Sequence, residues 1–222
     1  MQGHVHLIAG TPESSRRKIL AQSTEADEQP KSCFIFPEEI DFDDYPSIKW
    51  AWTNDEFEIQ TSTNPDIDEF FLFISNKIEF PLQIEATILL LEKNPNLSLG
   101  RILLFINAQF LDDQNIYSWL DGSAHFADLL CLTGRTNTNA RLINECIDRY
   151  KSMKYPLDCL ILSNRKSPPI SRILNPSPRR ISHIFDPPDI LEPDDNLESD
   201  PFLEKTPTGE RLKPIPLIFE NQ

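Results

Sequence analysis

Short apolar runs alternate with amphipathic helical patterns along most of residues 4–162. Apolar runs of strand length occur at residues 4–9, 33–36, 70–74, 101–106, 127–132 and 157–162. Helical spacing of apolar residues occurs at 13–22, 82–93, 116–126 and 140–153. This alternation predicts an α/β fold with a mostly parallel sheet and helices on both faces. In such a sheet any ligand site lies at the carboxyl ends of the strands.

The composition changes after residue 163. Residues 165–222 hold 11 of the 19 prolines, and residues 186–204 carry eight acidic residues and no basic one. Such a segment is too polar and too often interrupted by proline to build a core by itself. The sequence therefore predicts an ordered domain over residues 1–164 and a flexible, Pro-rich, charge-segregated tail over residues 165–222. Residues 213–219 are apolar enough to dock, either on a partner or back on their own domain.

The charge of the chain is strongly acidic. Its 222 residues include 21 basic and 35 acidic side chains, for a net charge of -14. This balance argues against a nucleic-acid partner, and the basic run at residues 165–180 has no aromatic side chains that could stack on bases. The sequence also has no uninterrupted run of about 18 apolar residues that would predict a membrane helix. We therefore expect a cytoplasmic protein with neither a nucleic-acid nor a membrane partner.

Metal-binding and catalytic patterns are weak in this sequence. His4 and His6 lie on one face of a predicted strand, but no third ligand is near them in sequence. Ser123, His125 and Asp128 lie too close together along the chain to form a catalytic triad. The cysteines occur singly, with no C-x-x-C pair, so buried thiols are expected. The four cysteines are Cys33, Cys131, Cys146 and Cys159.

The loop after the first predicted strand is the place to look for a phosphate-binding pattern, G-x-x-x-x-G-K-[ST]. On that pattern Gly10 takes the first glycine, Ser15 the second, Arg16 the lysine and Arg17 the hydroxyl residue. Glu13 puts a negative charge where a phosphate would lie. The three consecutive basic residues Arg16, Arg17 and Lys18 could attract an anion to the start of the helix. A first helical turn exposed to solvent is the simpler interpretation.

Beyond this loop, the order and spacing of several segments resemble the GTPase domain of the CobW family of P-loop GTPases. Residues 5–10 resemble the strand that opens into the phosphate loop, and residues 74–81 resemble a Glu-Thr-Thr-Gly-Leu-Ala-Asp-Pro type motif in length and final proline. Residues 106–108 resemble a Val-Asp-Ala turn, and residues 127–136 occupy the place of an Ala-Asp strand followed by Asn-Lys-x-Asp. The resemblance covers roughly residues 4–163 and implies a P-loop NTPase-like fold.

The nucleotide motifs of that family are altered in this chain. The resemblance implies that Arg16 stands for the phosphate-binding lysine, Ile74 for an acidic residue and Lys77 for a glycine near the terminal phosphate. Thr133 and Thr136 stand for the Asn and Asp that recognise guanine. Phosphoryl transfer depends on charge neutralisation and positioning by such groups. These substitutions predict a degenerate nucleotide site.

Two functional hypotheses follow from the resemblance. In the first, the chain is a catalytically inactive, CobW-like pseudo-GTPase that binds another protein and needs no cofactor. In the alternative, it is a GTP-dependent CobW-type metal chaperone or cofactor-assembly GTPase, in which Arg16 and Arg17 replace the lysine and the magnesium ligand, and GTP and Mg²⁺ are cofactors. The family's C-x-C-C metal cluster has no counterpart in residues 52–63, which contain no cysteine. A resemblance that arises by chance is a third possibility. The sequence does not indicate an oligomeric state.

Overall fold

The structure is a computed structural model that describes residues 3–25, 31–40, 47–60, 67–163, 166–174, 177, 179–186 and 200–219. Its strands are β1 (Gly3–Gly10), β2 (Ser32–Pro37), β3 (Ser47–Thr53), β4 (Glu56–Ile59), β5 (Glu69–Phe73), β6 (Leu97–Asn107), β7 (Leu129–Thr133) and β8 (Asp158–Ile161). Its helices are α1 (Arg16–Glu25), α2 (Phe80–Lys93), the 3-10 helix η1 (Ala108–Asp112), α3 (Ile116–Phe126), α4 (Ala140–Ser152) and α5 (Ile170–Leu174).

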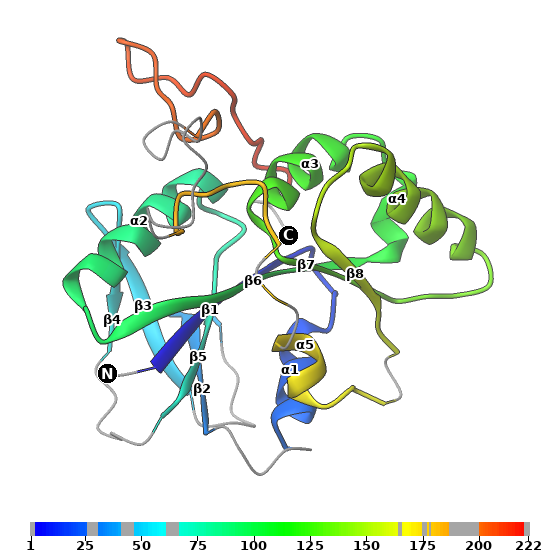
Figure 1. Ribbon diagram of the computed structural model, residues 1–222, viewed down its shortest axis with the longest axis horizontal. Helices are drawn as coiled ribbons and strands as arrows, with labels where there is room; N and C mark the ends of the chain where they lie inside the picture. The colour runs from blue at the N-terminus through cyan, green and yellow to red at the C-terminus, as the bar shows by residue number, and fades with distance from the viewer. Residues whose placement is uncertain are drawn as a thin grey trace.

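The described strands form one eight-stranded sheet in the order β4-β3-β2-β5-β1-β6-β7-β8. Neighbouring strands are parallel except for the antiparallel pair β3–β4. Helices α2, α3 and α4 lie on one face, and α1 and α5 lie together on the other (Figure 1). The predicted fold class, a mostly parallel α/β sheet with helices on both faces, is confirmed.

Each face of the sheet carries its own apolar cluster. Leu7 of β1 packs with the residues under α2, α3 and α4, whereas its neighbour Ile8 packs with those under α1 and α5. Successive side chains of a strand point to opposite faces, so a strand covered on both sides must be apolar throughout. This requirement explains why the central strands read as continuous apolar runs in the sequence.

The hairpin β3–β4 was not among the predicted strands. Its turn residues Asn54 and Asp55 have φ values of 53° and 60°, which suits the tight turns that match the twist of a hairpin. Trp50 pairs with Ile59, and Trp52 with Phe57. The alternation of these apolar residues around Asn54-Asp55 is the signal that could have revealed the hairpin.

The flexible tail over residues 165–222 stays a prediction, but the described part of that segment packs against the domain at several places. Helix α5 buries Ile170 and Ile173 on the α1 face of the sheet. Phe202, Ile215 and Phe219 are buried in the cluster on the opposite face. Ile215 and Phe219 belong to residues 213–219, for which docking back on the domain was one of the two expected possibilities. The burial of Phe202 was not expected, because this residue is flanked by Pro201 and belongs to no periodic run.

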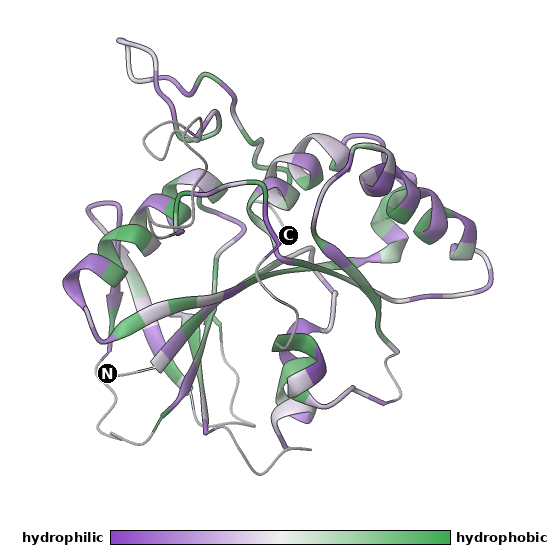
Figure 2. Cartoon of the chain, in the orientation of Figure 1, coloured by the Kyte–Doolittle hydropathy of each residue, from purple (hydrophilic) through white to green (hydrophobic). Residues whose placement is uncertain are grey.

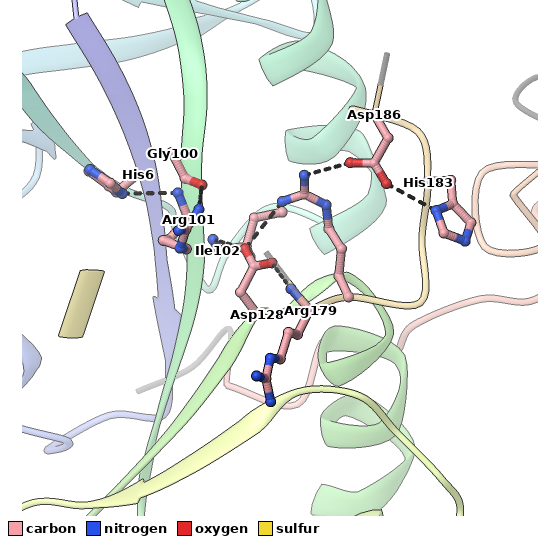
Figure 3. Close-up of polar contacts among 9 residues, drawn as sticks. His6, Gly100, Arg101, Ile102, Asp128, Arg179, His183 and Asp186 are labelled. Atoms are coloured by element: carbon pink, nitrogen blue, oxygen red, sulfur yellow. Dashed lines mark hydrogen bonds and ion pairs between the residues drawn. The ribbon is translucent and has the colours of Figure 1, made fainter. Parts of the chain in front are cut away.

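A buried carboxylate joins the sheet to this later part of the chain (Figure 3). Asp128 is fully buried and accepts hydrogen bonds from the backbone N–H groups of Ile102 and Arg179, both at 2.8 Å. The guanidinium of Arg180 lies 3.2 Å from the same carboxylate and 3.0 Å from Asp186. Because a buried charge is stable only when it is paired and hydrogen-bonded, these contacts fix the C-terminal segment against the sheet.

We expect Arg180→Met to lower the free energy of unfolding by about 3 kcal/mol, because it leaves the buried Asp128 charge without its cation. Urea denaturation followed by circular dichroism measures this change. Arg179→Met is the matched control, since the Arg179 guanidinium pairs with Asp158 at a largely exposed position and such pairs contribute about 0–1 kcal/mol. Equal effects of the two substitutions would contradict the assignment.

Among the helices of the described ranges, none combines the length and apolar composition that a membrane-spanning helix needs.

Candidate functional site

The loop between β1 and α1 lies against the ends of β5 and β6, at the carboxyl edge of the sheet. The Asn76 side chain donates a hydrogen bond to the carbonyl of Gly10 at 3.2 Å. The backbone N–H of Thr11 donates to Phe105, and the Thr11 hydroxyl accepts a hydrogen bond from the N–H of Asn107, both at 2.9 Å. This is the edge where parallel sheets bind ligands, so it is the candidate site.

Gly10 is required here by close packing. A Cβ atom at this position would lie 2.3 Å from the carbonyl oxygen of Phe105 on β6. Gly134, just after β7, is similar: its φ is 66°, and a Cβ would lie 2.4 Å from the Asn107 side-chain oxygen. Both glycines therefore have a structural reason that is independent of any phosphate.

Arg16, which the sequence pattern would place at the phosphate-binding lysine, contacts its own loop. One guanidinium nitrogen donates to the Thr11 carbonyl at 2.6 Å and to the Ser14 hydroxyl at 3.0 Å. Burial, with the positive charge of Arg17 as a second cause, lowers the pKa of Arg16 to about 10. A lysine that binds phosphate must extend toward the ligand, whereas the Arg16 guanidinium donates a hydrogen bond to the Thr11 carbonyl of its own loop.

The backbone of this loop also departs from a phosphate cradle. Pro12 has no N–H to donate. Glu13 and Ser15 have φ values of 53° and 55°, a left-handed conformation that costs non-glycine residues roughly 1–2 kcal/mol. The Glu13 carbonyl accepts a hydrogen bond from the Asn107 amide at 3.2 Å, and its carboxylate accepts one from Gln109 at 3.0 Å. Side chains of β6 and η1 therefore hold the turn in place.

The loop after β5 is held by Gln83 of α2. The Gln83 side chain accepts a hydrogen bond from the Ser75 N–H and donates to the Ser75 carbonyl, both at 2.8 Å, and also donates to the Ile78 carbonyl at 2.9 Å. Ile74, which stands for an acidic residue, is buried in the core, and Lys77 is exposed. The backbone groups of Ser75 are thus satisfied within the protein.

Of the two positions that the resemblance assigns to guanine recognition, Thr133 is buried and Thr136 is exposed. Thr133 is buried, and its hydroxyl donates to the Ile106 carbonyl at 3.3 Å. The N–H of Thr136 donates to the Asn139 side chain at 2.7 Å, and Asn139 donates to the Gly134 carbonyl at 3.0 Å. These contacts form a self-contained turn at the same edge of the sheet as the loop after β1.

A pocket of about 350 Å³ opens between the loop after β1, the loop after β5 and the residues that follow β2. Its charged lining mixes both signs, so its walls oppose a polyphosphate as well as attract one. The cations are Arg16, Arg17 and Lys77, and the acids are Glu13 and Glu39. Of the residues expected at a nucleotide site, this pocket brings together Glu13, Arg16, Arg17, Ile74 and Lys77. Gly10, Ser15, Thr133 and Thr136 are not among its lining residues.

Sequence reasoning missed Gln83, Asn107 and Thr11, which do most of this bracing. Asn107 directly follows the apolar run of β6, and a polar residue at a strand end is the signal that could have indicated it. Gln83 carries no such signal, because a buried glutamine in an amphipathic helix resembles a surface residue until its partners are known.

Candidate metal ligands do not assemble in the described ranges, where no group of three or more His, Cys, Asp or Glu side chains surrounds a common point. His6 pairs with Glu69, and burial lowers the pKa of His6. His4 instead hydrogen-bonds the Ser98 hydroxyl at 2.8 Å. The cysteines are all free thiols; burial raises the pKa of each of them, for Cys33 to about 11.

We expect Gln83→Met to lower the free energy of unfolding by about 2 kcal/mol, because it leaves buried backbone groups of Ser75 without partners. Thermal and urea denaturation measure the loss. Gln109→Met is the control, since its side chain contacts the exposed carboxylate of Glu13. A Gln83 variant as stable as the Gln109 variant would show that the loop after β5 does not depend on this clamp.

Comparisons with known proteins give structural neighbours alone. Neither a scan of protein-family models nor a search of curated proteins gives a match. A Zn(II)-bound crystal structure of the YjiA GTPase from E. coli aligns at 12% identity and a TM-score of 0.47, over 73% of this chain and 57% of the other. A Zn(II)-bound triple mutant of YjiA GTPase aligns at 11% identity and 0.49, over 78% and 61%. The chain spans less than two thirds of either solved protein, and similarity at this level assigns it no activity.

Proposed function

We propose that this chain is a CobW-like pseudo-GTPase domain, without nucleotide chemistry, that acts as a protein-interaction module. The observation that carries the proposal is the Arg16 guanidinium, which is hydrogen-bonded to Thr11 and Ser14 of its own loop. In this arrangement the side chain at the lysine position donates to its own loop and does not extend toward a bound phosphate.

The cost of rearranging the loop supports this proposal. To reach a phosphate, Arg16 would have to leave the Thr11 carbonyl, and the hydrogen bonds from Asn107 and Gln109 would have to release Glu13. Micromolar affinity needs about 8 kcal/mol of net binding free energy. Pro12 lacks an N–H and Arg17 stands where a magnesium hydroxyl ligand is required, so the loop has few groups that could supply it.

The alternative is a GTP-dependent CobW-type metal chaperone or cofactor-assembly GTPase with an atypical site. The pocket beside the loop favours it, because Arg16, Arg17 and Lys77 all line that pocket and could neutralise phosphates. The carboxylates of Glu13 and Glu39 in the same wall weigh against it.

The partner in the first proposal is another protein. Leu212 has 57% of its surface exposed, the highest exposed fraction among the large apolar side chains of the described residues, and it lies on a loop that projects from the domain. The cytoplasmic location expected from the composition stays a prediction.

We expect isothermal titration of the purified chain with GTP or ATP, with and without Mg²⁺, to give no saturable heat at micromolar concentration. Arg16→Ala should behave in the same way, because the guanidinium serves the loop and not a ligand. Saturable, Mg²⁺-dependent heat that disappears in Arg16→Ala would refute the pseudo-GTPase proposal and favour the GTPase alternative.

A further inference from the structure

Residues 200–219, here called the C-terminal strap, lie across the outer side of the domain without joining the sheet. The strap contains no helix and no strand of the sheet. Its two ends contact the domain, and Lys205 and Arg211 pair with Glu85 of α2. The segment between Lys205 and Arg211 forms a loop that projects away (Figure 1). Hydrophobic residues occur where the strap returns to α3, and hydrophilic ones cover much of the projecting loop (Figure 2).

Three apolar side chains of the strap fill a recess on α3. Phe202, Ile215 and Phe219 are each 4% exposed. A Cβ atom at Gly122 would lie 2.6 Å from Ile215 and 3.2 Å from Phe202, so this glycine makes room for both. The Phe219 and Trp119 rings meet edge to face, with centroids 5.3 Å apart. The α3 recess is lined by Phe110, Trp119, Gly122, His125 and Phe126.

Charged contacts fix the start and the middle of the strap. The Asp200 carboxylate lies 2.8 Å from the His125 ring nitrogen and accepts the Phe202 N–H at 3.0 Å. Burial alone would raise the pKa of Asp200, but its hydrogen bonds, that from His125 foremost, hold this pKa below its usual value. Arg211 forms an ion pair with Glu85 of α2, with hydrogen bonds of 2.8 and 2.6 Å.

This mode of attachment is that of a bound peptide: an extended segment held by a few buried side chains and by ion pairs. The strap follows residues 187–199, and a chain of 13 residues reaches at most about 47 Å when extended. By its length alone, this connection would keep the strap joined to the domain if the strap left the recess. The departure of the strap would remove the ring contacts that Phe202 and Phe219 make with this aromatic lining.

We propose that the α3 recess is a docking site for an extended peptide of a partner protein, and that the strap occupies it in cis. The chemistry of the strap defines the partner segment: a carboxylate for His125, an aromatic residue two positions later for the space beside Gly122, and further apolar residues for Trp119. This inference rests on the proposed interaction function and names the surface that carries it.

The test uses the full chain with a protease recognition sequence inserted between residues 187 and 199, purified folded and then cut. A fluorescein-labelled synthetic peptide of residues 200–219 is the probe, and its anisotropy reports binding. We expect saturable uptake by the cut protein after overnight exchange. The uncut protein should bind the probe at least about tenfold more weakly, because its tethered strap competes at high effective concentration.

Variants of the probe provide controls that leave the protein unchanged. A Phe202→Ser peptide should bind at least about tenfold more weakly, since it loses a buried aromatic anchor. A Leu212→Ser peptide should bind as well as the parent, because Leu212 is mostly exposed.

Three results would overturn the proposal: equal uptake by cut and uncut protein, no uptake by the cut protein, or a Phe202→Ser peptide that binds like the parent. A dimer of the uncut chain in sedimentation that is lost in Ile215→Ser would assign the recess to the strap of a second copy instead. The readout uses no nucleotide, so GTP binding in the titrations would remove the proposed function without altering this result.

Discussion

The buried carboxylate of Asp128 is the interaction on which the arrangement of the rest depends. It lies between the sheet and the C-terminal part of the chain, where it accepts hydrogen bonds from Ile102, Arg179 and Arg180. The following residues are then in place for the N–H groups of Ile181 and Ser182 to donate to the carbonyl of His125. The contacts of one buried charge thus place Ile181 and Ser182 beside α3, the helix against which the strap also packs.

The carboxyl edge of the sheet shows the same use of polar groups for internal support. Asn76, Arg16 and Asn107 each donate to a carbonyl of the loop between β1 and α1. A phosphate cradle needs free N–H groups that face the ligand, whereas this loop has carbonyls that face protein donors. At this edge, where parallel sheets bind ligands, the loop carbonyls are hydrogen-bonded by side chains of the protein.

Periodicity in the sequence was sufficient to predict the parallel sheet, because a strand buried on both faces must be apolar along its length. It was not sufficient for the strap, since the strap forms no helix or strand of the sheet. The apolar composition of residues 213–219 indicated a docking segment, but not that Phe202 would join it in the same recess. The degeneracy of the nucleotide motifs was inferred from the sequence and stays a prediction. The direction of the Arg16 side chain was not, because it depends on the left-handed backbone of Glu13 and Ser15.

Methyl-resolved NMR on the full chain tests most directly whether the strap belongs to the folded domain. The structure places the terminal methyl group of Ile215 2.8 Å from where a Cβ of Gly122 would be. We predict a strong nuclear Overhauser effect between that methyl group and the Hα protons of Gly122, with the methyl shift displaced by the nearby rings. A methyl signal at the random-coil position, with no such effect to α3, would contradict the structure of the strap and the recess it fills.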